Sequence, residues 1–83
     1  MASVDEDDVV RRAKAIYEQR LRANLEATHR GEFVCIEPDS GDHFVGPSLV
    51  EVVRAARRAH PDRITYTVRI GFPVVVEIGT TSC

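Results

Sequence analysis

Apolar side chains recur every three or four positions along the first third of the chain. The apolar positions are Val9, Val10, Ala13, Ile16, Tyr17, Leu21 and Leu25. This spacing is typical of an amphipathic helix with one apolar stripe. Ser3 and Glu6 have the spacing of a capping box at the start, and Gly31 suits a left-handed cap at the end. We therefore predict a helix over residues 4–30, about seven turns long.

The pattern then changes to one typical of strands. Residues 33–36 are rich in β-formers, and turn residues including Pro38 and Gly41 separate them from a second apolar run at 43–45. Glycine at the left-handed position closes a tight turn without steric cost. We predict a β-hairpin over residues 32–45, with Gly41 in that position.

A second amphipathic segment follows the Gly46-Pro47 break. Ser48 and Glu51 repeat the capping-box spacing, and Pro61 ends the helical pattern. The apolar positions between them, at helical spacing, are Leu49, Val52, Val53, Ala56 and Ala59. This segment predicts a helix over residues 48–60 whose apolar stripe packs on a sheet.

Two further strands complete the expected fold. Residues 64–70 alternate strictly between apolar and polar side chains, residues 74–78 are mostly β-branched, and residues 79–83 are expected to form a flexible tail. The elements predict an α+β fold in the order helix, β-hairpin, helix and two strands, or α-β-β-α-β-β. Both helices are expected to pack on one four-stranded, mainly antiparallel sheet.

Length and composition narrow the class of protein. A chain of 83 residues supports one hydrophobic core, so we expect a single domain. Apolar runs are too short to span a bilayer, and the acidic start differs from a signal peptide, so we expect a cytoplasmic protein without membrane contact. A net charge of −2 argues against strong attraction to nucleic acid. Two cysteines are too few for a disulfide scaffold.

The polar residues of the hairpin suggest chemistry that simpler interpretations also explain. Asp39-Ser40-Gly41 matches the triplet of retroviral-type aspartyl proteases, but a tight turn requires the same residue types. Glu37, Asp39 and Asp42 are too few to satisfy a calcium ion, which takes six or more oxygen ligands. We interpret these residues as a solvated turn, and expect no metal ligand and no cofactor.

A nucleophile pair is the remaining catalytic candidate. Cys35 and His43 lie near each other across the predicted hairpin, as a thiol and its base must. Strand alternation need not place both side chains on one face, and no third orienting group is evident. Cys35 is more simply a small buried apolar side chain. We therefore predict no catalytic residues and a non-enzymatic protein.

Two surfaces are candidates for partner binding. The first is the apolar stripe of the long helix, with Val10, Ile16, Tyr17 and Leu21, because a helix of this length exceeds the width of a small sheet. A partner protein or a second subunit is expected to cover the excess. The simpler interpretation is that the stripe covers only the chain's own sheet.

The second surface is basic. Arg54, Arg57 and Arg58 lie on the predicted second helix, with Arg69 further along the chain. Arginine recognises carboxylates and phosphates through its planar fork, so this surface fits an acidic protein or a nucleic-acid backbone. The simpler interpretation is that these arginines keep the helix soluble and complement its dipole.

Several segments resemble a known group of sequences. The segments are Gly31–Glu37, Ser40–Asp42, Gly46–Ser48, His60–Arg63 and Tyr66–Gly71. They resemble a family of short uncharacterised prokaryotic proteins described as antitoxin-like, over roughly Tyr17 to Ile78. The resemblance implies an accessory protein that binds the product of a neighbouring gene, and it implies no catalytic residues. The chain has no ribbon-helix-helix arm, which argues against autorepression.

These observations lead to three hypotheses of function. The first is a protein-interaction module, antitoxin-like or an accessory subunit, that contacts a partner or a second copy through the helix stripe or a sheet edge. The second is a weak nucleic-acid-binding protein that uses the arginine face of the second helix. The third is a small enzyme built on Cys35 and His43.

Overall fold

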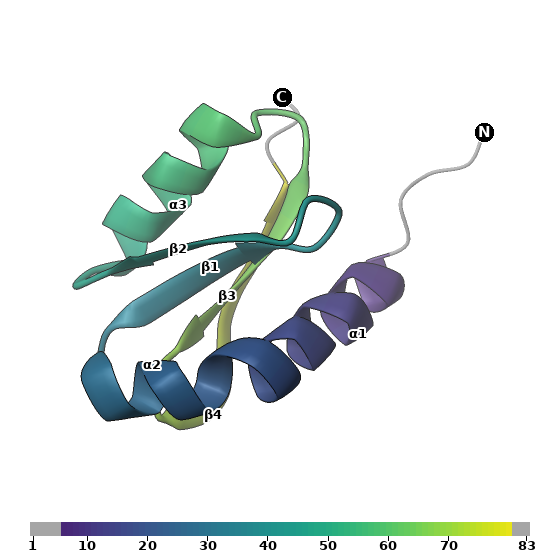
Figure 1. Cartoon of the computed structure of the whole chain (residues 1–83). Helices are drawn as coiled ribbons and strands as arrows, with labels where there is room; N and C mark the ends of the chain where they lie inside the picture. The colour runs from purple at the N-terminus through teal and green to yellow at the C-terminus, as the bar shows by residue number, and fades with distance from the viewer. Residues whose placement is uncertain (1–5, 81–83) are drawn as a thin grey trace.

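The computed structural model describes residues 6–80, and Figure 1 shows a helical arm, a sheet and a second helix. The elements are α1 (Glu6–Ile16), η1 (Tyr17–Leu21), α2 (Arg22–Thr28), β1 (Phe33–Glu37), β2 (Asp42–Gly46), α3 (Leu49–Ala59), β3 (Ile64–Arg69) and β4 (Phe72–Thr80). The predicted α+β class, with a long N-terminal helix, an antiparallel sheet and a further helix, is confirmed. The predicted cap at Ser3 and residues 81–83 of the predicted tail lie outside the described residues.

A π-helical segment, η1, divides the long helix, so the prediction of one uniform α-helix over residues 4–30 is wrong there. Val9, Ala13, Tyr17 and Leu25 are all buried, and they are separated by multiples of four. An α-helix repeats every 3.6 residues, so apolar positions spaced by four drift around its axis. The wider π turn corrects this drift and returns Leu25 to the buried face.

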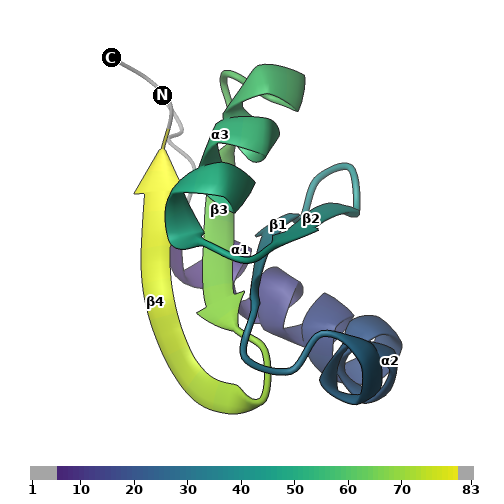
Figure 2. The same cartoon turned by 90° about the vertical axis from the view of Figure 1, so that its left-hand side faces the viewer.

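The sheet has the strand order β2-β1-β3-β4, and all of its neighbours are antiparallel. Cys35 in β1 lies opposite Phe44 in β2 and Thr67 in β3. The chain therefore leaves β2, crosses β1 through α3, and returns on the far side of β1 as β3. β2 and β4 form the two edges of the sheet, and Figure 2 shows β4 beside β3 at one of them.

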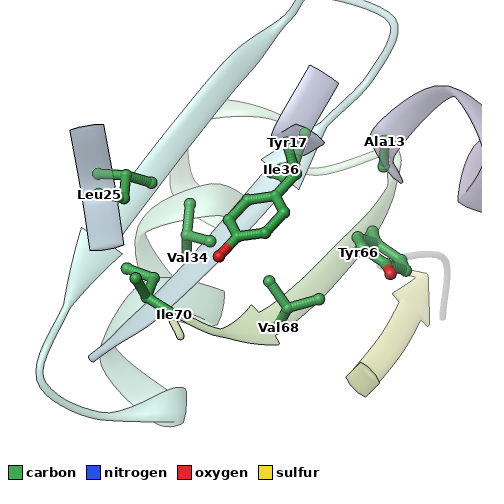
Figure 3. Close-up of a cluster of buried hydrophobic side chains, with 8 residues drawn as sticks. All are labelled: Ala13, Tyr17, Leu25, Val34, Ile36, Tyr66, Val68 and Ile70. Carbon is green, nitrogen blue, oxygen red and sulfur yellow. The ribbon is translucent and has the colours of Figure 1, made fainter. Parts of the chain in front are cut away.

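The helices cover opposite faces of the sheet. Figures 1 and 2 place α3 on one face and the α1–α2 arm on the other. Figure 3 shows the larger core, under the arm, formed by Ala13, Tyr17, Leu25, Val34, Ile36, Tyr66, Val68 and Ile70. On the other face, Cys35 packs with Val52 and Ala56 of α3. Successive side chains of a strand point to opposite faces of the sheet, so they pack alternately under the α1–α2 arm and under α3.

Local signals agree with the structure at most element ends. The Ser48 hydroxyl accepts a hydrogen bond from the Glu51 amide at 3.2 Å, as the capping-box spacing predicts. Gly41 has a φ of +81°, the left-handed conformation expected at the hairpin turn. β4 is longer than predicted, because its hydrogen-bonded register with β3 continues to Thr80, beyond the boundary expected at residue 78.

Candidate functional site

The structure does not assemble the Cys35/His43 pair. Cys35 is fully buried on the α3 face of β1, opposite Phe44. His43 lies opposite Ile36, which belongs to the core on the other face of the sheet, and its side chain is exposed. Because successive strand residues point to opposite faces, the thiol and the imidazole lie on different sides of the sheet.

Glu37, one of the three acids of the hairpin, bonds to the turn itself. Glu37 is 1% exposed, and its carboxylate accepts hydrogen bonds from the amides of Asp39 at 3.0 Å and Ser40 at 2.8 Å. A carboxylate inside a turn satisfies amides that no strand partner reaches. In the described part of the chain, histidine, cysteine and acidic side chains form no group of three or more suited to a metal ion.

His60, which the sequence did not single out, joins the hairpin tip to the end of α3. Its Nε2 lies 2.8 Å from Asp42 Oδ2 and 3.4 Å from the Ser40 hydroxyl. The Ser40 hydroxyl in turn accepts from the Asp42 amide at 3.1 Å. Ser40, Asp42 and His60 thus form one hydrogen-bonded network that connects the hairpin tip to the end of α3. The signal for it was His60 at the end of the predicted helix, directly before Pro61.

Asp39 forms two ion pairs at the same hairpin tip. Its two carboxylate oxygens accept from Arg12 of α1 at 2.9 Å and from Arg63, which follows α3, at 3.1 Å. The hydrogen bond with Asp39 raises the pKa of Arg12 above its ordinary value. The charged side chains around the hairpin therefore hold α1, the turn and the segment after α3 together.

The residues proposed on the helix stripe lie against the chain's own core. Tyr17 is 9% exposed, while Val10, Ile16 and Leu21 are half-buried and pack on the core under the arm. The arrangement agrees with the simpler interpretation of this stripe, in which it covers the sheet of the same chain. Only the half-buried edges of the stripe remain for a partner.

The proposed arginines of α3 have a different environment. Arg54, Arg57 and Arg58 are exposed, and among the described residues none of them forms an ion pair or a hydrogen bond. Arg69 does not join them. Its Nε donates to the Gly31 carbonyl at 3.1 Å, and its guanidinium lies 4.4 Å from the centre of the Phe72 ring. Arg69 therefore has partners within the chain, unlike the three arginines of α3 among the described residues.

An apolar groove of about 270 Å³ runs along the flank of α3. Its described lining consists of Leu49, Val50, Val53, Arg54 and Arg57. Val50 is 59% exposed, the largest exposed fraction of any large apolar side chain in the described residues. Val50 was missed at the sequence level because it falls outside the stripe that the helical spacing assigned to the core. The groove and its two arginines, called here the α3 groove, are the candidate site.

Comparisons with known proteins do not identify a function for this site. No family model, curated protein or solved structure matches the chain. Among the described residues, no helix is long and apolar enough to cross a membrane.

Proposed function

We propose that this protein is a non-enzymatic interaction module whose α3 groove binds an acidic, amphipathic segment of a partner protein. The supporting observation is the combination of exposed Val50 with Arg54 and Arg57 on one groove. A partner that inserts an apolar side chain beside Val50 and presents carboxylates to the arginines satisfies both kinds of group. The proposal extends to the role that the antitoxin-like resemblance implies, an accessory subunit of another protein.

The physical basis is that each part of the groove recognises a different feature. Arginine binds a carboxylate through two parallel N–H groups, which fixes orientation as well as charge. Apolar contact at Val50 supplies the burial that stabilises most protein interfaces at their centre. The 11 residues of α3 form a helix about 16 Å long, which matches a partner helix of about three turns.

Nucleic-acid binding is the competing function for the same arginines. It uses the guanidinium groups of Arg54, Arg57 and Arg58 on phosphates but gives no role to Val50. The net charge of −2 also opposes approach to a polyanion. These two points favour the acidic protein segment.

A selection from a random library of displayed peptides tests the proposal. The purified chain is the bait, and the selected peptides are measured by fluorescence anisotropy against the chain and two variants. Val50→Asp places a carboxylate in the groove, whereas Ala59→Asp places one on the exposed end of the same helix, outside the groove lining. We expect the selected peptides to combine acidic and large apolar residues.

The affinity of these peptides should fall about tenfold or more in Val50→Asp, and less than about threefold in Ala59→Asp. Equal losses in both variants would contradict the proposal. So would a selection without acidic residues, or tight, salt-dependent binding of a random oligonucleotide that Val50→Asp leaves unchanged.

A further inference from the structure

A second groove, of about 360 Å³, lies on the opposite face of the sheet from α3. It runs between the N-terminal helical arm and the β3–β4 hairpin, and its volume is in the range of small-molecule sites. Tyr17, Tyr66, Val68 and Phe72 give it an aromatic and apolar lining. Tyr17 is also the first residue of η1, and π-helical turns occur often at functional sites.

A row of alternating charges forms the helical rim of this groove. The row is Lys14, Glu18, Arg22, Glu26 and Arg30, at spacings of four. Arg22 donates to Glu18 at 2.7 Å and to Glu26 at 3.1 Å, so it occupies both carboxylates. Lys14, at one end of the row, forms no ion pair with any described residue. Arg30, at the other end, lies against Gly71 and forms none with a described residue either, so the rim offers a cation at each end.

The phenol of Tyr66 is the second unoccupied group. Tyr66 is 3% exposed, yet among the described residues its hydroxyl has no hydrogen-bond partner. The described residues contain no fully enclosed side-chain polar atom without a partner, so the hydroxyl is not fully enclosed, and Tyr66 itself lines the groove. Tyr17 lines the same groove, where burial raises the pKa of its phenol and the backbone of Gly71 lowers it. Figure 3 shows both rings between the helical arm and the strands.

We propose that this groove binds a small monocarboxylate with an aromatic or branched apolar body. Its carboxylate pairs with the Lys14 ammonium and accepts a hydrogen bond from the Tyr66 hydroxyl. Its apolar body lies against Tyr17 and Val68. Three cations and two acids on the rim sum to +1, so a monocarboxylate balances the charge of the groove, whereas a phosphate dianion leaves an excess negative charge there.

This groove shares no described lining residue with the α3 groove, so ligand binding to it can be tested independently of partner binding. Phenylacetate is the probe, and neutral phenylacetamide is its matched analogue. Lys14 is the only lysine in the sequence, so reductive methylation with carbon-13 gives a side-chain NMR signal at the proposed contact. Amide NMR spectra of the unmodified chain report binding along the rest of the groove.

We expect phenylacetate to shift the Lys14 signal and the amides around Tyr17 and Tyr66, with an affinity in the millimolar range. Phenylacetamide should bind about threefold or more weakly. Tyr66→Phe, which keeps the ring, should weaken phenylacetate binding about fivefold. Arg11→Gln, on the same helix but outside the groove lining, should leave it unchanged.

Equal binding of the acid and the amide would overturn the proposal. So would unchanged affinity in Tyr66→Phe, provided that its amide spectrum remains that of the folded chain, or shifts confined to residues outside the groove. Binding of inorganic phosphate at this site more tightly than phenylacetate would contradict the choice of ligand.

Discussion

Arginines around the hairpin tip pair with carboxylates, whereas the arginines of α3 have no such partner in the described part of the chain. Arg12 and Arg63 share Asp39, at 2.9 and 3.1 Å, and connect separate elements. Arg54 and Arg57 instead flank an apolar groove beside an exposed valine. The same residue type therefore connects elements of the fold in one region and has no carboxylate partner among the described residues in the other.

The surroundings of a charged side chain say more about its role than its position in the sequence. An arginine within hydrogen-bond distance of a carboxylate stabilises the fold, and no binding partner is needed to explain its presence. An arginine without one, next to exposed apolar surface, is better explained by a partner that supplies both the carboxylate and the apolar contact. The following experiments test whether the two regions differ in this way.

The largest effect is expected at the buried acid of the hairpin tip. Glu37→Ala removes the acceptor of two turn amides and leaves them without a partner, so the free energy of unfolding should fall by about 2–3 kcal/mol. Urea denaturation measures this change. Glu32→Ala, which removes an exposed acid paired with His29, should cost less than about 1 kcal/mol. Equal decreases in the free energy of unfolding would show that the hydrogen bonds of Glu37 do not stabilise the hairpin tip.

The next effect concerns buried phenols, which are neither paired charges nor surface groups. Burial raises the pKa of Tyr66 and of Tyr17 above the ordinary value near 10. A raised pKa in the folded state favours the neutral phenol there, so its contribution is complete below pH 10 and is lost as the pH rises through the folded-state pKa. The free energy of unfolding should therefore decline above pH 10, and less steeply in Tyr66→Phe. An unchanged slope in that variant would contradict the burial of this phenol.

A smaller effect is expected from the bridging acid. Asp39→Asn keeps the shape of the turn but removes the charge shared by Arg12 and Arg63, so the free energy of unfolding should fall by about 1 kcal/mol. The loss should shrink in high salt because these side chains are partly exposed. Denaturation at low and high salt measures both values. A decrease in the free energy of unfolding that does not depend on salt would show that the substitution acts through the geometry of the turn and not through the charge.

The smallest effect on stability is expected on α3. Arg54→Gln and Arg57→Gln remove charges that contact no described carboxylate, so the free energy of unfolding should change by less than about 0.5 kcal/mol. Thermal denaturation of each variant beside Asp39→Asn makes the contrast direct. Destabilisation as large as that of Asp39→Asn would show that these arginines are also structural.

Much of the fold follows from local sequence signals. The Ser48 cap, the left-handed Gly41 and the strand expected over residues 64–70 are each determined by a few neighbouring residues, and each is present in the structure. The π turn at Tyr17 was not predicted, because it corrects a drift that matters only once the helix lies on a sheet. The strand order was also beyond prediction, since the crossover through α3 depends on packing between distant segments.

The candidate site was predictable only in part. Arg54, Arg57 and Arg58 were evident from the sequence as a basic cluster, but showing that no described carboxylate pairs with them required the positions of the neighbouring acids. Val50 was not singled out because exposure depends on which face α3 turns to the sheet. The roles of Glu37 and His60 depend on how the hairpin meets the end of α3, which is also a tertiary feature.

A matched pair of charge reversals distinguishes binding through the α3 groove from binding through the charge of α3 alone. Arg57 lines the groove and the adjacent Arg58 does not, so Arg57→Glu and Arg58→Glu change the net charge equally on the same helix. Isothermal titration of a selected acidic peptide should give about a tenfold loss of affinity for Arg57→Glu and less than about threefold for Arg58→Glu. Equal losses in the two variants would show that the charge of α3, and not its groove, determines binding.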